Sequence, residues 1–291
     1  MMNHLSFDAL DLEHYRRRIQ RADHIEEFND IEIHGENGAR VSFDLFCPSR
    51  SNPARQQREQ QEVSSAPPLM IFLHSGSWKA GTKSQFHSHC LHFTNTFGFK
   101  TLTTSYRLST EAVYPAPIHD IQFLLHWIKE NHVALHIDPE RIILVGTSAG
   151  ANIAASVITE QHTYDQGLQP KLSILFNGEF DMWDLIEQGS LVDAMNAYVG
   201  STPDVRPDRF DAISPLKHVK PNMPSTLLLH GTNDQFVSHQ QSIDFKNTML
   251  THGNHAEVHI CEDKQHNWFL KEPDFSSINH IIDVFIREQL D

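Results

Sequence analysis

The sequence predicts an α/β fold in which a mostly parallel central sheet has an antiparallel N-terminal edge and carries helices on both faces. Short, uninterrupted apolar runs such as residues 69–73 and 142–145 are typical of strands buried on both faces of a parallel sheet. Helical stretches alternate with these runs, which implies right-handed crossovers. With 39% hydrophobic and 21% charged residues, the 291-residue chain has an ordinary globular composition, and we expect a single domain over residues 1–291.

The N-terminal part of the chain predicts a helix, a hairpin and a loop. Apolar positions at helical spacing in residues 6–21 predict an amphipathic helix within the N-terminal segment 1–29. Residues 30–34 and 40–46 predict two strands joined by a Gly-containing turn, with one face solvated. The polar stretch 47–66 is expected to be an exposed loop and not a domain linker, because strands continue directly beyond it.

The rest of the chain alternates between predicted strands and helices. The predicted strands are residues 69–73, 100–106, 142–145, 171–176, 225–229 and 256–260. The predicted helices are residues 82–97, 117–133, 151–159, 238–252 and 275–290, the first of them ended by Gly98. Residues 178–215 contain several aromatic side chains but no clear strand, so we expect this stretch to form a partial lid or a pocket wall.

The segment Gly146-Thr147-Ser148-Ala149-Gly150 fits the pattern G-x-S-x-G between a buried strand and a helix. A turn sharp enough to lift a serine hydroxyl clear of the sheet brings backbones so close that a Cβ at either glycine would clash. The helix N-terminus beneath the serine carries a positive partial charge, which suits a developing oxyanion. This pattern predicts Ser148 as a nucleophile, and the alternative is a Gly/Ser-rich connection without chemistry.

A serine nucleophile needs a base within hydrogen-bond reach, and the base needs an acid that fixes its tautomer. Asp234 follows the strand 225–229, and His266 follows the last strand, so both are expected at the carboxyl edge of the sheet. Position decides the choice of His266, because the chain contains 21 histidines. The less well placed alternatives are Asp181, Asp263, His255 and His259.

The oxyanion is expected to be held by backbone N–H groups, one of them directly after the nucleophile. The predicted donors are the N–H groups of Ser75, Gly76 and Ala149. The predicted pocket wall consists of Trp78, Phe180, Trp183, Phe236 and Trp268. No metal site is expected among the histidines of residues 87–92, because His87 and His89 would point to different sides of a helix. Arg107 is expected to be structural and to pair with Asp120.

The net charge of -14 disfavours nucleic acids and anionic membranes as partners, because phosphate contacts need a basic patch. No apolar run has the length of a membrane span, and residues 1–23 lack the apolar core of a signal peptide. Three widely spaced cysteines fit free thiols in a reducing compartment, so we expect a cytoplasmic location. The expected partner is a small-molecule ester substrate, and the sequence leaves open whether the chain forms a homodimer.

Residues 30–290 resemble the α/β-hydrolase superfamily, and within it the esterase/lipase branch of BD-FAE-like and hormone-sensitive-lipase-like carboxylesterases. The motifs are His74-Ser75-Gly76-Ser77-Trp78, Ser105-Tyr106-Arg107-Leu108, Tyr114-Pro115-Ala116 with Asp120, Asp138-Pro139-Glu140-Arg141-Ile142 before the serine turn, Ser214-Pro215, His230-Gly231-Thr232-Asn233-Asp234 and His266. Hormone-sensitive-lipase-like lid helices are thinly represented, so the BD-FAE-like branch is the closer match. The resemblance implies an α/β-hydrolase fold and a triad of Ser148, Asp234 and His266.

The sequence departs from this family pattern at two places. Ser75 and Ser77 stand where the oxyanion loop of the family has glycines, which narrows the site next to the substrate. Asn267-Trp268 follows the histidine where the family usually has Gly and Phe. The second departure places a bulky aromatic side chain near the pocket.

These observations predict a serine carboxylesterase that hydrolyses small carboxylic acid esters through an acyl-enzyme without a metal or organic cofactor. One alternative is an arylformamidase or another amidase of the same fold. The other is a non-catalytic ligand receptor on a hydrolase scaffold. The receptor is disfavoured because such proteins lose a member of the triad, and Ser148, Asp234 and His266 are all present.

Overall fold

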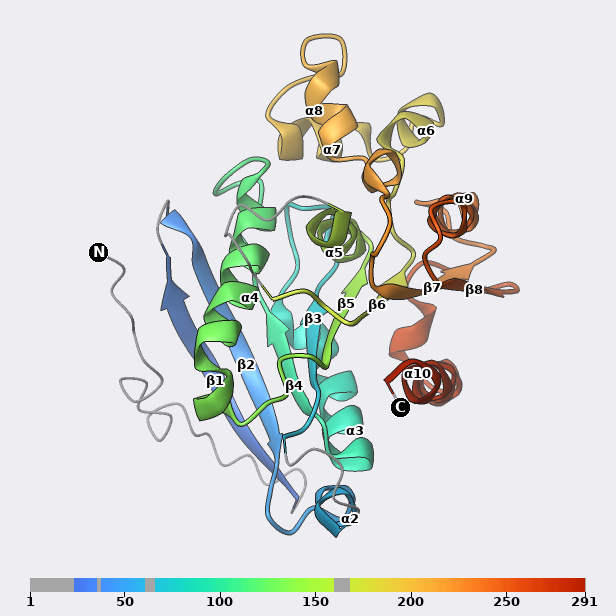
Figure 1. Cartoon of the computed structure of the whole chain (residues 1–291). Helices are drawn as coiled ribbons and strands as arrows, with labels where there is room; N and C mark the ends of the chain where they lie inside the picture. The colour runs from blue at the N-terminus through green and yellow to red at the C-terminus, as the bar shows by residue number, and fades with distance from the viewer. Residues whose placement is uncertain (1–23, 36–37, 61–65, 160–167, 291) are drawn as a thin grey trace.

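The computed structural model describes residues 24–35, 38–60, 66–159 and 168–290 (Figure 1). The helix predicted over residues 6–21 lies outside the described residues. Within them, eight strands form one sheet in the order β1-β2-β4-β3-β5-β6-β7-β8. The strands are β1 Ile25–His34, β2 Arg40–Pro48, β3 Leu69–Leu73, β4 Lys100–Thr104, β5 Ile142–Thr147, β6 Leu172–Phe176, β7 Ser225–Gly231 and β8 Ala256–Cys261.

The β1–β2 and β2–β4 pairs are antiparallel, and the other pairs, from β4–β3 to β7–β8, are parallel. The predicted mostly parallel sheet with an antiparallel N-terminal edge is therefore confirmed. The helices of the described residues are α2 Pro53–Gln60, α3 His87–Phe97, α4 Ala116–Leu135, α5 Ala149–Thr159, α6 Met182–Glu187, α7 Val192–Val199, α8 Pro207–Ala212, α9 Gln240–Thr251 and α10 Asp274–Leu290, with the short 3₁₀ turns η3 Lys83–Phe86, η4 Pro215–His218 and η5 Trp268–Leu270.

Alternation along the central strands divides the core into two layers. In β3, Leu69 and Ile71 face the core under α4, α5 and α9, whereas Met70 and Phe72 face the core under α3 and α10. Both layers are visible in Figure 1, with α4 and α5 on one face of the sheet and α3 and α10 on the other. Each fully buried leucine or isoleucine in these layers stabilises the fold by about 1.5–3 kcal/mol.

The polar stretch 47–66 is not simply an exposed loop, because α2 lies within it. Asn52 is fully buried, and its Oδ1 accepts a hydrogen bond of 3.0 Å from the Arg55 N–H, while its Nδ2 donates to the Thr94 carbonyl. Asn at the N-cap followed by Pro53 in the first turn is a helix-start signal. The composition of the stretch obscured this local signal.

The predicted lid consists of the short helices α6, α7 and α8, which lie together at one end of the molecule (Figure 1). They lie on the side where α5 begins, because the Asn152 side chain of α5 donates a hydrogen bond of 3.0 Å to the carbonyl of Ile213, just after α8. This arrangement places residues 178–215, which we call the cap, close to the turn that carries Ser148.

Candidate active site

Ser148 occupies the turn between β5 and α5 in a left-handed backbone conformation, with φ at 51°. Its N–H donates a hydrogen bond of 2.9 Å to the carbonyl of Phe176 at the end of β6. A Cβ on Gly146 would overlap the carbonyl of Gly150, and a Cβ on Gly150 would overlap the carbonyl of Leu73. The steric reason predicted for both glycines is confirmed, and the backbone strain at Ser148 costs about 1–3 kcal/mol.

Asp234 and His266 meet at the carboxyl edge of β7 and β8. The His266 Nδ1 lies 2.6 Å from Asp234 Oδ2, and the Asp234 side chain is fully buried. An ionised carboxylate can only accept hydrogen bonds, so the proton of the neutral ring is on Nδ1. The His266 Nε2 is left unprotonated and can take a proton from a nucleophile.

Backbone and side-chain donors converge on Asp234. Its Oδ1 accepts hydrogen bonds from the N–H groups of Phe236 at 2.9 Å and Val237 at 3.0 Å. The His230 Nε2 lies 3.4 Å from Oδ2. Burial alone would raise the pKa of the Asp234 carboxyl, but hydrogen bonds from His230 and His266 outweigh it and hold this pKa well below its usual range. Asp234 therefore stays ionised beside His266.

Consecutive residues at the end of β6 connect the two halves of the site. The Phe176 carbonyl accepts from the Ser148 N–H, and the Asn177 side chain donates to the carbonyl of His266. Asn177 is fully buried and has a positive φ of 45°, a conformation that asparagine tolerates better than most residues. The strand end thus holds the serine turn and the histidine loop at the same edge of the sheet.

The Ser148 hydroxyl donates a hydrogen bond of 3.0 Å to Oε1 of Glu179, a side chain that the sequence reasoning missed. Among the described residues, the Ser148 hydroxyl forms this hydrogen bond to Glu179 and no hydrogen bond to His266. The signal available in the sequence was an acidic residue close after a buried parallel strand, but only Asp181 was considered there. Asp181 instead caps α6, because its carboxylate accepts from the Trp183 N–H at 2.9 Å.

The loop between β3 and η3 has a tight backbone. Gly76 has a φ of 132°, and a Cβ there would overlap the Ala80 carbonyl. The carbonyl of His74 accepts a hydrogen bond of 2.8 Å from the Tyr106 hydroxyl, and the two rings stack with centroids 4.4 Å apart. In the part of the chain that the structure describes, the N–H of Gly76 donates no hydrogen bond, so it is available to a ligand.

Ser75 differs from the expectation that its N–H points at an oxyanion. Its N–H donates a hydrogen bond of 2.7 Å to Gln85 Oε1, and the Gln85 Nε2 donates to Ser75 Oγ at 2.8 Å. The side-chain amide of Gln85 therefore binds both the backbone and the hydroxyl of Ser75. The backbone N–H of Ser75 is already engaged in a hydrogen bond. Gly76 and Ala149 remain as the predicted donors whose N–H groups are not taken in this way.

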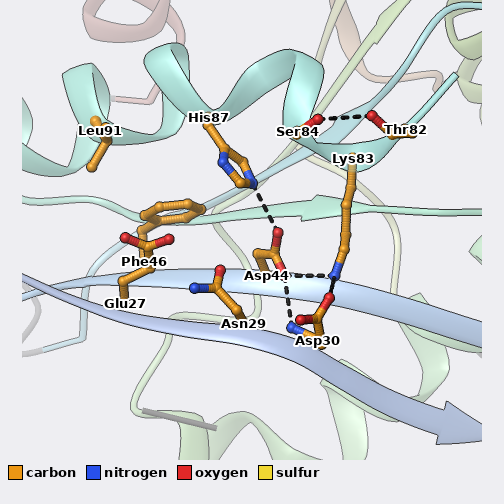
Figure 2. Close-up of a pocket in the computed structure, with 10 residues that line it drawn as sticks. All are labelled: Glu27, Asn29, Asp30, Asp44, Phe46, Thr82, Lys83, Ser84, His87 and Leu91. Atoms are coloured by element: carbon orange, nitrogen blue, oxygen red, sulfur yellow. Dashed lines mark hydrogen bonds and ion pairs between the residues drawn. The ribbon is translucent and has the colours of Figure 1, made fainter. Parts of the chain in front are cut away.

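The 3₁₀ turn η3 that carries Gln85 is anchored to β2 by charged side chains (Figure 2). The Lys83 Nζ lies 2.6 Å from Asp44 Oδ1 and 2.7 Å from Asp30 Oδ1, and His87 Nε2 lies 2.8 Å from Asp44 Oδ2. Burial would raise the pKa of Asp44, but hydrogen bonds from His87 and Lys83 outweigh it and lower this pKa. These groups line a cavity of about 360 Å³.

The aromatic side chains predicted to form the pocket wall have different surroundings. Trp78 and Phe180 are fully buried core residues, so the prediction that they line a pocket is wrong. Trp78 stacks on Tyr198 with ring centroids 5.0 Å apart, and Phe180 stacks on Phe245 at 4.5 Å. Both side chains fill space between the sheet and the cap.

The other three predicted pocket residues are accessible to different degrees. Phe236 is 55% exposed, and its ring centroid lies 5.3 Å from that of His266. Trp183 is half-buried, and its Nε1 donates to Asp211 Oδ1 at 2.7 Å. Trp268 packs edge-on against Phe269, which belongs to the core layer under α3 and α10. Phe236 is therefore the aromatic side chain placed directly at the candidate site.

No group of three or more His, Cys, Asp or Glu side chains in the described ranges is arranged to hold a metal ion. His87 faces Asp44, whereas His89 is buried among aromatic rings, so the two point to different sides of α3 as expected. Burial lowers the pKa of His89 to about 3. In residues 24–290, as far as they are described, no helix combines the length and apolar character needed to cross a bilayer. Arg107 pairs with Asp120 at 2.8 Å, as predicted.

The fold and the strand–turn–helix geometry around Ser148 define an α/β-hydrolase. The chain belongs to the BD-FAE family, whose model matches residues 58–249. Solved structures support the fold: the native esterase Est2 of Thermogutta terrifontis has a TM-score of 0.71 at 20% identity and matches 89% of this chain and 92% of its own. A truncated carbohydrate esterase from gut microbiota has a TM-score of 0.72 at 20% identity and matches 90% of this chain and 95% of its own.

Curated relatives match a smaller part of the chain. An ethyl acetate hydrolase of Pseudomonas putida is 22% identical over 179 residues, which cover 59% of this chain and 53% of that protein. The esterase LipQ of Mycobacterium tuberculosis is 25% identical over 189 residues, which cover 61% of this chain and 44% of that protein. The chain thus spans about half the length of the curated relatives that it matches.

Proposed function

We propose that the chain is a serine carboxylesterase that hydrolyses small carboxylic acid esters through an acyl-enzyme on Ser148. One observation carries the proposal: a serine on a strained turn and an Asp234–His266 pair are held at the same edge of the sheet by two consecutive residues, the last of β6 and the one that follows it. The names of the matched relatives, an ethyl acetate hydrolase and an esterase, support the same chemistry.

In this proposal His266 is the base and Asp234 fixes its tautomer. The Ser148 hydroxyl turns from Glu179 to His266, whose Nε2 takes the proton as the oxygen attacks the ester carbonyl. The N–H groups of Gly76 and Ala149 hold the oxyanion, and Ala149 adds the positive end of α5. His266 then gives the proton to the leaving alcohol. In the second half of the cycle His266 takes a proton from water, which attacks the acyl-enzyme, and the acid is released from Ser148.

The surroundings of Ser148 favour small substrates. Ser148 is only 4% exposed, so little space is open beside its hydroxyl for a long acyl chain. The exposed Phe236 beside His266 offers an apolar contact at the mouth of the site. We propose that residues 178–215 serve as the partial lid of one hydrolase domain.

The substitution Ser148→Ala tests the nucleophile directly. We expect kcat/KM for p-nitrophenyl acetate to fall by about 10³-fold or more, because triad members act as a unit. Labelling by a fluorophosphonate should disappear while the circular dichroism spectrum stays that of the wild type. Ser156→Ala is the matched control, because Ser156 lies buried in α5 and its hydroxyl has no partner in the described residues.

Three outcomes would contradict the proposal in different ways. An aryl formamide that is hydrolysed faster than the matching aryl acetate would make the protein an arylformamidase with the same nucleophile. A wild-type protein that neither hydrolyses esters nor reacts with a fluorophosphonate would instead be a ligand receptor on this fold. Undiminished labelling of the Ser148→Ala variant would remove Ser148 from the mechanism.

A further inference from the structure

Glu179 is a buried acid at the nucleophile to which the proposed triad assigns no task. The residue is fully buried, and its Oε1 lies 3.0 Å from Ser148 Oγ. Its Oε2 is buried without a hydrogen-bond partner in the part of the chain that the structure describes. No Lys, Arg or His among the described residues forms an ion pair with it. Such an acid is a poor structural element, because burying an incompletely paired charge destabilises a fold.

The backbone around Glu179 is held firmly. The Asn152 Nδ2 donates to the Glu179 carbonyl at 2.9 Å, and Gln241 Oε1 accepts from the N–H groups of Phe180 at 2.8 Å and Asp181 at 2.7 Å. A Cβ on Gly178 would overlap the Phe180 ring, so this turn also excludes a larger residue there. Side chains of α5 and α9 thus fix the backbone that carries Glu179, and this backbone holds its carboxyl group beside Ser148. A fixed and incompletely paired polar group is typical of a functional site.

Acylation changes the surroundings of this carboxyl group. The Ser148 hydroxyl is the side-chain donor to Glu179 Oε1 in the described residues, next to a contribution from the backbone of Glu179 itself, and in the acyl-enzyme the Ser148 oxygen has no hydrogen to donate. Both carboxyl oxygens would then be buried without a side-chain donor, which is costly for a polar group. A water molecule is small enough to restore a donor there, directly beside the ester bond that must be hydrolysed.

We propose that Glu179 is a catalytic residue of deacylation, which holds the hydrolytic water against the acyl-Ser148 ester. The inference rests on the proposed esterase function. One hydrogen of the water is donated to Glu179, and His266 Nε2 takes the other as the water oxygen bonds to the acyl carbon. When the tetrahedral intermediate collapses, the bond from the acyl carbon to Ser148 Oγ breaks, and His266 returns the proton to that oxygen. The acid leaves, and the Ser148 hydroxyl again donates to Glu179.

The variant Glu179→Gln separates this role from positioning of the serine. Its neutral amide oxygen can still accept from the Ser148 hydroxyl, but it is a weaker acceptor for the hydrogen of the attacking water than a carboxylate is, and its NH₂ group can only donate. With p-nitrophenyl acetate in rapid-mix experiments, we expect acylation to stay within about threefold of the wild type, and deacylation to slow by about tenfold or more. Intact mass after acid quenching should show acetylated enzyme accumulating to one acetyl group per chain.

Asp181→Asn is the matched control, because it removes an acid two residues away that caps α6 and does not contact Ser148. Asparagine is an equally good cap, so both rates should match those of the wild type. If Glu179→Gln fails to fold, Glu179→Asp withdraws the carboxyl group by one methylene and should slow deacylation in the same way.

The inference is overturned if deacylation is unchanged in the Glu179 variants, or if acylation and deacylation fall by the same factor. Equal losses would mean that Glu179 only orients the nucleophile. Failure of the esterase proposal looks different, because the wild-type enzyme itself would then form no acetyl-enzyme. The two failures are therefore read from different samples in one experiment.

Discussion

Two carboxyl groups lie at the candidate site, and their hydrogen bonds give them opposite properties. Burial alone would raise the pKa of Asp234, but hydrogen bonds from His230, His266 and the Val237 N–H outweigh it and lower this pKa. For Glu179, burial dominates and raises the pKa to about 7, and the charge of His266, the backbone of Glu179 itself and the Ser148 hydroxyl offset this rise only in part. One acid is therefore ionised at neutral pH, whereas the other is close to half-protonated.

The raised pKa of Glu179 predicts a stability cost that grows with pH. The unfolded chain has the ordinary pKa of 4.5, so between pH 4.5 and about 7 the native state binds more protons than the unfolded state. Stability contributed by this residue therefore falls as pH rises, by about 3 kcal/mol across the window. We expect Glu179→Gln and the wild type to unfold at similar urea concentrations at pH 5, and the variant to be clearly more stable at pH 8.

Urea titrations of both proteins at pH 5, 7 and 8 measure this difference. Asp234 does not confuse the comparison, because its lowered pKa affects stability only in more acidic solution and is common to both proteins. A difference in unfolding free energy that stays constant with pH would show that Glu179 does not titrate in this range.

At the scale of elements, the 3₁₀ turn η3 links the charged groups of β2 to residues 74–78, the proposed oxyanion loop. Lys83 and His87 fix the turn against Asp44, and Gln85 between them binds both sides of residue 75. The Thr103 hydroxyl adds a hydrogen bond of 2.7 Å to the Lys83 carbonyl. The position of the Gly76 N–H therefore depends on side chains outside residues 74–78.

Gln85→Leu is expected to loosen the oxyanion loop while leaving the fold intact. The change removes the acceptor for the Ser75 N–H, so the Gly76 N–H next to it is less well aligned with a developing oxyanion. We expect kcat to fall by about tenfold or more with a smaller change in KM, since the lost interaction acts in the transition state.

Steady-state kinetics with p-nitrophenyl acetate check this expectation. The exposed Gln56 of α2, whose side chain contacts the Arg50 carbonyl far from the loop, provides the control Gln56→Leu. If Gln85→Leu keeps the wild-type kcat, the amide of Gln85 does not position the oxyanion loop.

At the scale of the whole molecule, the aromatic side chains divide between the core and the mouth of the site. Trp78 is fully buried, and its Nε1 donates to Asn152 Oδ1 at 3.2 Å, whereas Phe236 is exposed beside His266. Trp78→Phe should lower the free energy of unfolding by about 1–2 kcal/mol, because it leaves Asn152 Oδ1 without its donor. It should leave the ratio of acetyl to butyryl ester hydrolysis unchanged.

Phe236→Ala should change the ester preference and leave the free energy of unfolding almost unchanged. Removing an exposed ring costs little stability, but it removes an apolar contact at the mouth of the site, so activity on butyryl esters should fall relative to acetyl esters by about three- to tenfold. Measuring kcat/KM for both esters and urea unfolding for both variants compares the two residues. A changed ester ratio in Trp78→Phe with no change in Phe236→Ala would reverse these assignments.

The sheet was predictable from the sequence because its strands are short apolar runs, and their order along the chain limits the topology. The serine turn was predictable because both glycines are required sterically, as Gly146 and Gly150 show. Asn52-Pro53 was overlooked because the surrounding stretch is polar. The surroundings of Trp78 could not be predicted, because the same aromatic side chain can face a pocket or stack on a distant ring such as Tyr198.

Glu179 and Ser75 show a second limit of sequence reasoning. A motif identifies which N–H groups could bind an oxyanion, but whether an N–H is free depends on a side chain elsewhere, here Gln85. An acid becomes part of a candidate site only when the fold buries it against another functional side chain, as Glu179 is buried against the Ser148 hydroxyl. Both facts depend on contacts between residues that are separate in the sequence.

Asn152 has a mechanical consequence for how a substrate enters. Its buried amide joins the carbonyls of Glu179 and Ile213 and the Nε1 of Trp78, so one side chain ties the cap, the acid at the nucleophile and the oxyanion loop to α5. If residues 178–215 opened and closed as a hinged lid, these buried hydrogen bonds of Asn152 would have to break each time. We therefore expect residues 178–215 to keep their position during turnover, so that an ester would reach Ser148 past the exposed Phe236 and not through a hinged opening.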